Sequence, residues 1–506
     1  MNIKRAKQEI IDTVQVYLLK DEYGDYVIPQ LYQRPVLLLG APGIGKTQIM
    51  EQICRECRIG LVSYTITHHT RQSAIGLPFI AEETLDGRTF SMTRYTMSEI
   101  VASIYQKMET TGLKEGILFI DEINCVSETL APAMLQFLQC KTFGNHPIPE
   151  GWIIVAAGNP PEYNKSVRDF DVVTLDRIKK IEVEPDFDVW KEYALNVNIH
   201  PAVLSYLSLK PRNFYRMETT VDGIFFATPR GWEDLSRILT VYEKISKVPD
   251  REVIVQYIQY DDVARDFANY LELYYKYQAD YQIEDIFRGH IPDVLLQKTA
   301  HAPFDERFSL TGLILARCTR SFREYAVRED YVTFLHGRLL QLKEVLTAGR
   351  TAADGTAEHT RPYTVCEEIL TDMIKEREQL QKAELLTRDG KNTRLQAEMF
   401  LQECLPLLPA DGNRAFEVIR NSFAREKERY EEACRETGRT LEYAFDFMEA
   451  AFGNGQEMVL FITDLNASPV SLRYLKRYPC ERYYYYNQEL LIEDRSQALR
   501  REILEK

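Results

Sequence analysis

The sequence has 506 residues, a formal net charge of −14 at pH 7 and a hydrophobic share of 45%. These values predict a soluble globular protein with about two to four domains. The acidic balance argues against a protein whose main role is to coat nucleic acid. No apolar run approaches the length of a membrane span, and we expect no signal segment after Met1. Nine scattered cysteines fit a reduced, cytoplasmic location.

The first segments of the chain lead into a glycine-rich loop. Residues 3–19 are expected to form a helix, and the apolar run 36–39 predicts the first strand. An amphipathic segment that begins at Gln48 follows the loop, so the order is strand, loop, helix. In this context the pattern G-x-x-x-x-G-K-[ST] predicts a phosphate-binding site. The loop residues are Gly40, Ala41, Pro42, Gly43, Ile44, Gly45, Lys46 and Thr47.

The residue types in this loop suit a nucleoside triphosphate. Glycines let the backbone N–H groups form a concave nest for phosphate oxygens, and the start of the following helix adds partial positive charge. Lys46 can reach the β- and γ-phosphates, and the Thr47 hydroxyl can ligate Mg²⁺. We therefore expect residues 40–48 to bind the nucleotide. Cys54 and Cys57 lack a second pair that would complete a zinc site, so burial is expected there rather than metal or redox chemistry.

Two more strands and a hairpin are predicted after the loop. Residues 59–67 alternate like a second strand, and residues 72–95 predict a hairpin around the turn pair Asp86-Gly87. A helix is expected over residues 97–108. The continuous apolar run 116–120 predicts a third strand that is buried on both faces, as in a parallel sheet.

Polar side chains follow the third and fourth strands where each strand ends. Asp121 and Glu122 come directly after the third strand, at the edge where open α/β sheets place their chemistry. Asp121 suits a metal shell, and Glu122 suits the polarisation of an attacking water. The fourth strand, residues 152–157, leads to Asn159, whose amide can hold a water between Glu122 and the γ-phosphate. The sequence thus predicts a hydrolytic site.

Two arginines after the fourth strand are candidates for contacts with the nucleotide. Arg177 precedes the fifth expected strand, residues 178–184. Arg230 falls in the first turn of a helix that Thr228 and Pro229 begin as N-cap and first residue. The helix dipole disfavours a cation there unless an anion lies in front of it, although a surface salt bridge is the alternative. Helices are expected over residues 188–196, 201–209 and 232–245.

The second half of the chain is almost wholly helical in pattern. The small polar residues 347–362 predict a linker or mobile loop between two helical regions, residues 251–346 and 363–506. One long helix carries Ile419, Tyr430 and Cys434 on a single face, and Gly438 is expected just past its end.

The ordered motif set resembles an AAA+ ATPase. Under this resemblance, residues 40–47 are Walker A, residues 117–122 are Walker B, Asn159 is sensor 1, Arg177 is the arginine finger and Arg230 is sensor 2. More narrowly, the chain resembles the MoxR group of the helix-2-insert branch. This narrower resemblance rests on Asp121-Glu122-Ile123-Asn124, on Gly158-Asn159-Pro160 and on Gly76-Leu77-Pro78 at the start of the hairpin.

The likeness covers roughly residues 20–245 and implies an α/β P-loop NTPase core with a parallel sheet, a helical lid and a large, mostly α-helical C-terminal region. The domains expected are a nucleotide-binding α/β domain (1–184, with a hairpin insert near 72–95), a helical lid (185–250), a helical extension (251–346), a linker or mobile loop (347–362) and a C-terminal helical domain (363–506). The sequence departs from the family pattern after Asn124, and again at Ile178, where an aromatic residue is usual. Arg168 therefore competes with Arg177 for the finger role.

The resemblance also implies an activity and partners. We expect Mg²⁺-dependent ATP hydrolysis in a homo-oligomeric, hexameric ring, with Arg177 reaching the γ-phosphate of the neighbouring subunit and Arg230 drawing the lid onto the site. Chaperone-like remodelling with a partner that carries a von Willebrand factor A (VWA) domain is the implied output. Alternatives are a nucleic-acid translocase or restriction-type NTPase, and a chelatase-type motor subunit. The choice between ATP and GTP stays open.

Overall fold

The computed structural model of the chain describes residues 1–68, 74–85, 88–143, 145–163, 170, 172–221, 223–348 and 362–490. The chain divides into two compact units. Unit 1 comprises Met1–Val189 and Lys375–Lys391, and unit 2 comprises Trp190–Ile374 and Asn392–Lys506. The chain therefore leaves unit 1, builds most of unit 2, and returns to unit 1 for a short stretch.

Unit 1 is built on a parallel sheet, which has five strands among the described residues. The strand order is β2 (Gly60–Thr65), β5 (Gly116–Asp121), β8 (Trp152–Gly158), β1 (Val36–Gly40) and β9 (Lys179–Val183). All the neighbouring pairs are parallel. The parallel sheet expected from the apolar runs is thus confirmed. Because β5, β8 and β1 are neighbours, their carboxyl ends meet at one edge of the sheet.

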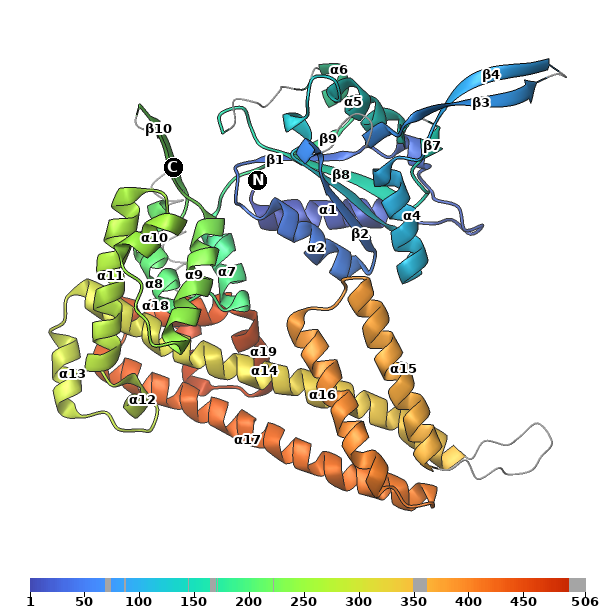
Figure 1. Cartoon of the computed structure of the whole chain (residues 1–506). Coiled ribbons are helices and arrows are strands. Elements are labelled where there is room, and N and C mark those ends of the chain that lie inside the picture. Colours follow the sequence, from blue (N-terminus) through green and yellow to red (C-terminus); the bar gives the residue numbers. More distant parts are fainter. Residues whose placement is uncertain are drawn as a thin grey trace, which may run out of the picture. The chain divides into compact units, whose positions relative to one another are not determined.

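Helices cover both faces of this sheet (Figure 1). On one face, α4 (Glu99–Thr111) and α5 (Ala131–Cys140) share a hydrophobic core with Leu118 and Ile120 of β5. The alternate β5 residues Ile117 and Phe119 are also fully buried, and α2 (Lys46–Cys57) packs against β5. Successive side chains of a strand point to opposite faces, so a strand covered on both sides needs an unbroken apolar run.

Smaller elements surround the sheet. An antiparallel hairpin of β3 (Pro78–Leu85) and β4 (Arg88–Tyr95) projects from unit 1 (Figure 1), and its turn pair Asp86-Gly87 lies outside the described residues. Helix α1 (Ile3–Tyr17) packs on α2 and β9. The remaining elements are the 3₁₀ turns η1 (Gln30–Tyr32), η2 (Ile66–His68) and η3 (Ile123–Cys125), the short strands β6 (Thr142–Phe143) and β7 (His146–Pro147), and α6 (Val172–Leu175).

Unit 2 is largely helical. Its elements are α7 (Phe187–Val197), α8 (Pro201–Leu209), η4 (Pro211–Asn213), β10 (Arg216–Thr220), β11 (Gly223–Ala227), α9 (Pro229–Lys244), α10 (Arg251–Tyr257), α11 (Asp261–Asp280), α12 (Ile283–Ile286), α13 (Asp293–Ala300), α14 (Phe304–Ala348), α15 (Pro362–Lys382), α16 (Arg388–Cys404), η5 (Leu405–Leu407), α17 (Gly412–Phe452), α18 (Gln456–Ala467) and α19 (Pro469–Arg477). The expected linker over residues 347–362 lies almost wholly outside the described residues, between α14 and α15.

Helix α14 is the central element of unit 2. It has 45 residues and packs against α8, α11, α17, α18 and α19. At the start of unit 2, Lys191 of α7 forms an ion pair with the buried Asp464 of α18, with 2.5 Å between Nζ and Oδ1. The tip of the α15–α16 pair belongs to unit 1, where Glu384 Oε2 lies 3.2 Å from Lys107 Nζ of α4.

Two features of unit 2 differ from the sequence prediction. Helix α17 does not end before Gly438 but continues to Phe452. A Cβ atom at Gly438 would lie 3.0 Å from the Tyr474 hydroxyl, so this glycine allows close packing against α19 instead of ending the helix. The antiparallel pair β10–β11 was not expected in a segment that reads as helical. Its sequence signal is the turn pair Asp222-Gly223.

No helix within the described ranges is long and apolar enough to cross a membrane.

Candidate nucleotide site

The glycine-rich loop joins β1 to α2, as the sequence predicts. Gly43 and Gly45 adopt left-handed backbone angles, with φ of 76° and 95°, and Gly45 is the N-cap of α2. Residues other than glycine adopt such angles at a cost in free energy, so the glycines stand where the loop backbone requires them. At Gly40 a Cβ atom would lie 2.6 Å from the carbonyl oxygen of Val183, which explains the glycine at the end of β1. The loop backbone thus begins close to β9 and ends at the N-cap of α2.

Lys46 points back into this loop and is buried, with 8% of its surface exposed. Its Nζ atom donates to the carbonyl oxygens of Gly40 at 2.8 Å and Ala41 at 2.9 Å. It also donates to Oδ1 of Asn159 at 2.8 Å. Two site residues predicted from distant parts of the sequence therefore touch.

Thr47 and Asp121 also meet. The Thr47 hydroxyl donates to Oδ2 of Asp121 at 2.9 Å, while Oδ1 of Asp121 accepts the backbone N–H of Glu122, also at 2.9 Å. A hydroxyl oxygen and a carboxylate oxygen, next to a loop that can hold phosphate, are the oxygen ligands that Mg²⁺ prefers. The residues present therefore fit a magnesium ion.

Glu122 stands in a left-handed conformation, with φ of 55° and ψ of 36°. This conformation is unfavourable for a residue other than glycine and here turns the chain from β5 into η3. Its carboxylate Oε2 accepts a hydrogen bond from Oγ1 of Thr67 at 3.1 Å. Thr67 follows β2, the neighbour of β5. It was missed by sequence reasoning because a threonine after a strand has no distinctive pattern.

Asn124 connects η3 with the end of β8. Its Nδ2 donates to the backbone carbonyl of Asn159 at 2.7 Å. A Cβ atom at Gly158 would lie 2.5 Å from Asn124 Oδ1, so the glycine before Asn159 makes room for this side chain. Asn124 is 5% exposed, and its Oδ1 has no hydrogen-bond partner among the described residues. The sequence analysis quoted Asn124 within a motif but gave it no role.

The other predicted loop residues differ in exposure. Ala41 and Ile44 are buried, Pro42 is half-buried, and Gln48 is exposed on the first turn of α2. Further along α2, Cys54 is buried and carries a free thiol. Burial raises its pKa to about 12, which disfavours the thiolate that metal binding or redox chemistry needs.

Two of the three candidate arginines lie among the described residues. Arg177, after α6, is exposed, and its Nη1 donates to Oε1 of Gln139 on α5 at 2.6 Å. Its competitor Arg168 lies outside the described residues. Arg230 belongs to unit 2, where it is exposed in the first turn of α9. The Thr228 N-cap accepts the backbone N–H of Gly231 at 3.3 Å, as expected from the sequence.

Comparison with known proteins identifies a family domain in the first part of the chain. Residues 36–173 match the protein family described as "ATPase family associated with various cellular activities (AAA)". They form an AAA ATPase domain, and the chain combines this P-loop NTPase core with a large helical region. No match was found among curated proteins. Among solved structures, a mutant of Thermotoga maritima RuvB is 14% identical, with 51% of this chain and 69% of that chain covered and a TM-score of 0.29.

Proposed function

We propose that this chain, through its AAA ATPase domain, hydrolyses ATP in a ring-shaped oligomer and thereby remodels a protein partner. The observation that carries the proposal is the convergence of Lys46, Thr47, Asp121 and Asn159 at one edge of the sheet. Glu122 follows Asp121 at the same edge. A phosphate-binding lysine, oxygen ligands for a cation, and a carboxylate beside an amide are the parts that phosphoryl transfer to water requires.

Each residue has a role set by its chemistry. Lys46 and the N–H groups of residues 40–48 hold the phosphates of the nucleotide, and Thr47 and Asp121 hold Mg²⁺. The bound cation supplies charge stabilisation for the phosphate oxygens. Glu122 orients and polarises the attacking water, which the Asn159 amide helps to place. The contacts of Lys46 with Gly40, Ala41 and Asn159 must be exchanged for phosphate oxygens when the nucleotide enters.

The ring is proposed because Arg177, the candidate finger, contacts α5 and not the phosphate-binding loop of its own chain. Arg177 is exposed and bonded to Gln139 on the surface of α5, so it is available to a neighbouring subunit. We assign it the finger role, with Arg230 as the lid residue that responds to the nucleotide. A ring with a site at each subunit boundary follows from this assignment, and the hexamer is taken from the resemblance to AAA+ ATPases.

The finer proposal is a MoxR-like, chaperone-like ATPase of the cytoplasm that works with a VWA-domain protein. It is supported by the motif at Asp121 to Asn124, the hairpin β3–β4 and the acidic composition of the chain. Co-purification from the native host tests the partner. Recovery of nucleic acid instead, with hydrolysis stimulated by DNA, would contradict it.

The central test is the substitution Glu122→Gln. It keeps the size of the side chain but removes the charge that polarises water, so turnover should fall at least about 100-fold while nucleotide binding persists. Phosphate release measures turnover, and a fluorescent ATP or GTP analogue measures nucleotide binding. Light scattering after size exclusion measures the assembly state. Glu150→Gln, on an exposed loop, is the matched control.

Two outcomes would contradict the proposal. Normal turnover in Glu122→Gln would overturn the role of Glu122. A wild-type protein that hydrolysed ATP normally but stayed monomeric with every nucleotide would overturn the ring.

A further inference from the structure

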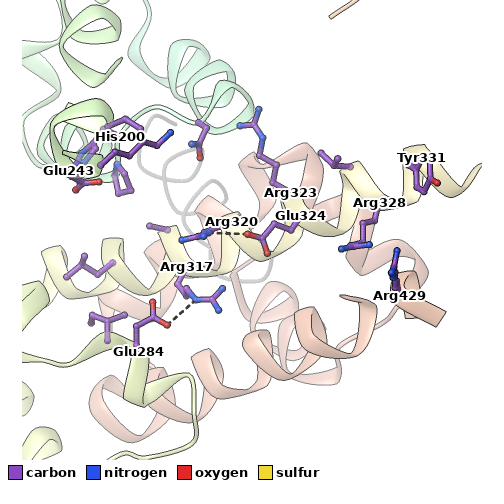
Figure 2. Close-up of a pocket in the computed structure, with 18 of the residues that line it drawn as sticks. His200, Glu243, Glu284, Arg317, Arg320, Arg323, Glu324, Arg328, Tyr331 and Arg429 are labelled. Carbon is purple, nitrogen blue, oxygen red and sulfur yellow. Dashed lines mark hydrogen bonds and ion pairs between the residues drawn. The ribbon is translucent and has the colours of Figure 1, made fainter. Parts of the chain in front are cut away.

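A cleft of about 1240 Å³ lies along α14 in unit 2 (Figure 2). Six lysine or arginine side chains and six aspartate or glutamate side chains line it, besides one histidine. Several of these charges pair within the cleft, as Arg320 does with Glu324 at 3.1 Å and Arg317 with Glu284 at 3.7 Å. The lining therefore favours neither an anionic nor a cationic ligand. A sharper signal lies in unit 1, at the buried side chain of Asn124.

The two residues proposed to place and polarise water stand beyond the paired part of the sheet. Along β5 the pairing with β8 ends at Ile120, and along β8 the pairing with β1 ends at Gly158. Glu122 and Asn159 follow these residues, so the ladder between β5 and β8 does not fix their separation. The next two residues after Asn159 are prolines, which have no N–H group with which to extend a ladder. Some other contact must hold the two segments together.

Asn124 supplies a hydrogen bond at this point. It lies in η3, two residues after Glu122, and its Nδ2 donates to the backbone carbonyl of Asn159 at 2.7 Å. The same side chain packs directly on Gly158, where a Cβ atom would lie 2.5 Å from Oδ1, 2.8 Å from Cγ and 3.0 Å from Nδ2. The amide has one orientation, because Oδ1 in place of Nδ2 would face a carbonyl oxygen. One side chain thus joins the segment that carries Glu122 to the backbone that carries the Asn159 amide.

The amide of Asn124 is a costly group with which to fill this space. The side chain is 5% exposed, and its Oδ1 has no hydrogen-bond partner among the described residues. A buried acceptor without a partner costs free energy, and an apolar side chain of similar size would fill the space without that cost. An apolar side chain could not, however, donate to the carbonyl of Asn159. The hydrogen bond is therefore the property that distinguishes asparagine at this position.

The side chain of Asn159 is sensitive to where its backbone lies. Its Oδ1 accepts a hydrogen bond from Lys46 Nζ at 2.8 Å, so the amide reaches from the end of β8 to the glycine-rich loop. A shift of the backbone would move this amide relative to both Lys46 and Glu122. Misplacement of a reacting group by about 1 Å can cost about 100-fold in rate. The rate should therefore depend on the backbone position more than the nucleotide affinity does, since Lys46 and the loop N–H groups are proposed to hold the phosphates.

We propose that Asn124 is a positioning residue, which sets the place of the Asn159 amide relative to Glu122 through its hydrogen bond to the Asn159 backbone. The inference rests on the proposed hydrolysis, in which Glu122 and Asn159 polarise and place the water. It separates Asn124 from the residues proposed to hold the nucleotide and the cation. Loss of Asn124 should thus lower kcat and leave nucleotide affinity almost unchanged.

The test combines single variants of the full-length protein with a double-mutant cycle. Asn124→Ala removes the donor, and Asn124→Asp keeps the size of the side chain but replaces its NH₂ group by an oxygen. Phosphate release at varied ATP concentration gives kcat and KM, a fluorescent ATP analogue gives the affinity, and differential scanning fluorimetry gives the melting temperature, well below which kcat is measured. Asn466→Ala, in α18 of unit 2, is the matched control, because it also removes an amide that donates a hydrogen bond, at 2.8 Å to Oδ1 of Asn487.

We expect kcat to fall about tenfold or more in both Asn124 variants, with the affinity for the analogue within about threefold of that of the wild type. The control should keep kcat within about twofold. In the Asn159→Ala background, either substitution at Asn124 should lower kcat by no more than about twofold further, since no amide is left to misplace. A general loss of packing would instead lower kcat by the same factor in both backgrounds.

Failure of this inference can be told apart from failure of the proposed function. Equal factors in the two backgrounds, or wild-type kcat in both Asn124 variants, would overturn the role of Asn124 while Asn159→Ala alone still lowered turnover. If the wild type released no phosphate, or if Asn159→Ala turned over normally, the proposed function of the site would be wrong. The role of Asn124 would then fall with it, because nothing would remain for Asn124 to position.

Discussion

The Nζ atom of Lys46 lies 2.8 Å from Oδ1 of Asn159, although 113 positions separate the two residues. The lysine that is proposed to bind phosphate is thus already held at the end of β8, beside the residue proposed to place water. This hydrogen bond couples the glycine-rich loop to the end of β8. A group that breaks it releases the Lys46 ammonium group and the Asn159 amide together.

The substitution Asn159→Ala tests the proposed role of the amide in placing the attacking water. If the amide stabilises the charge that develops during the reaction, its loss removes a hydrogen bond to a charged group, which is worth about 1.5–3 kcal/mol. We therefore expect turnover to fall about 10–150-fold, with KM for ATP changed much less. Steady-state phosphate release measures both constants. Asn196→Ala, at an exposed position of α7, serves as the control. Wild-type turnover in Asn159→Ala would show that the amide has no part in the reaction.

Mixing of two inactive variants tests whether Arg177 serves a neighbouring subunit. Lys46→Ala should destroy its own site but keep its arginine, and Arg177→Ala should keep its site but lose about 10³–10⁵ in rate. Mixed one to one, they should regain activity at roughly a quarter of the interfaces of randomly assembled rings. Lys180→Ala replaces a nearby exposed cation and should behave as wild type. Absence of recovery, with recovery in the corresponding Arg168→Ala mixture, would assign the finger to Arg168.

Gly158→Ala tests the packing under Asn159. The added Cβ would lie 2.5 Å from Oδ1 of the buried Asn124, so we expect a loss of about 1–3 kcal/mol in stability and lower turnover as Asn159 shifts. Differential scanning fluorimetry and phosphate release measure the two effects. At Gly337, in α14, a Cβ atom meets nothing within 4 Å, so Gly337→Ala should be neutral or slightly stabilising. Equal behaviour of the two variants would contradict the steric explanation.

The thiol of Cys54 gives a prediction about alkaline pH. Burial raises its pKa from 9.0 to about 12, so the folded protein keeps a proton that the unfolded chain loses above pH 9. The contribution of this group to the free energy of unfolding is therefore complete below pH 9 and is lost as the pH rises to 12. Iodoacetamide at pH 8 should modify the exposed Cys140 and spare Cys54, as mass spectrometry of tryptic peptides would show. Rapid modification of Cys54 in the folded protein would contradict its burial.

The sheet and much of the site follow from the sequence because their signals are local. An unbroken apolar run such as residues 116–120 indicates a strand covered on both faces, and the glycine spacing in residues 40–47 sets the loop. Pairing of β8 with both β5 and β1 then brings the ends of these three strands together. The contact between Thr67 and Glu122 joins two strand ends through one hydroxyl, and no periodic pattern reports it.

The organisation of unit 2 could not be predicted in the same way. Glycine often follows the last residue of a helix, yet Gly438 lies inside α17, where Tyr474 of α19 packs close to it. The cleft along α14 combines residues from helices more than 200 positions apart. The return of Lys375–Lys391 to unit 1 likewise depends on tertiary contacts that a reading of single segments does not contain.

The left-handed backbone at Glu122 has a consequence for directed evolution. An L-residue in this conformation costs roughly 1–2 kcal/mol, and glycine or asparagine would relieve much of it. A screen that rewards heat resistance alone would therefore tend to replace the carboxylate that is proposed to polarise water. Thermostable descendants of this protein should be screened for turnover at every round, because one available gain in melting temperature lies at the side chain that is proposed to activate water.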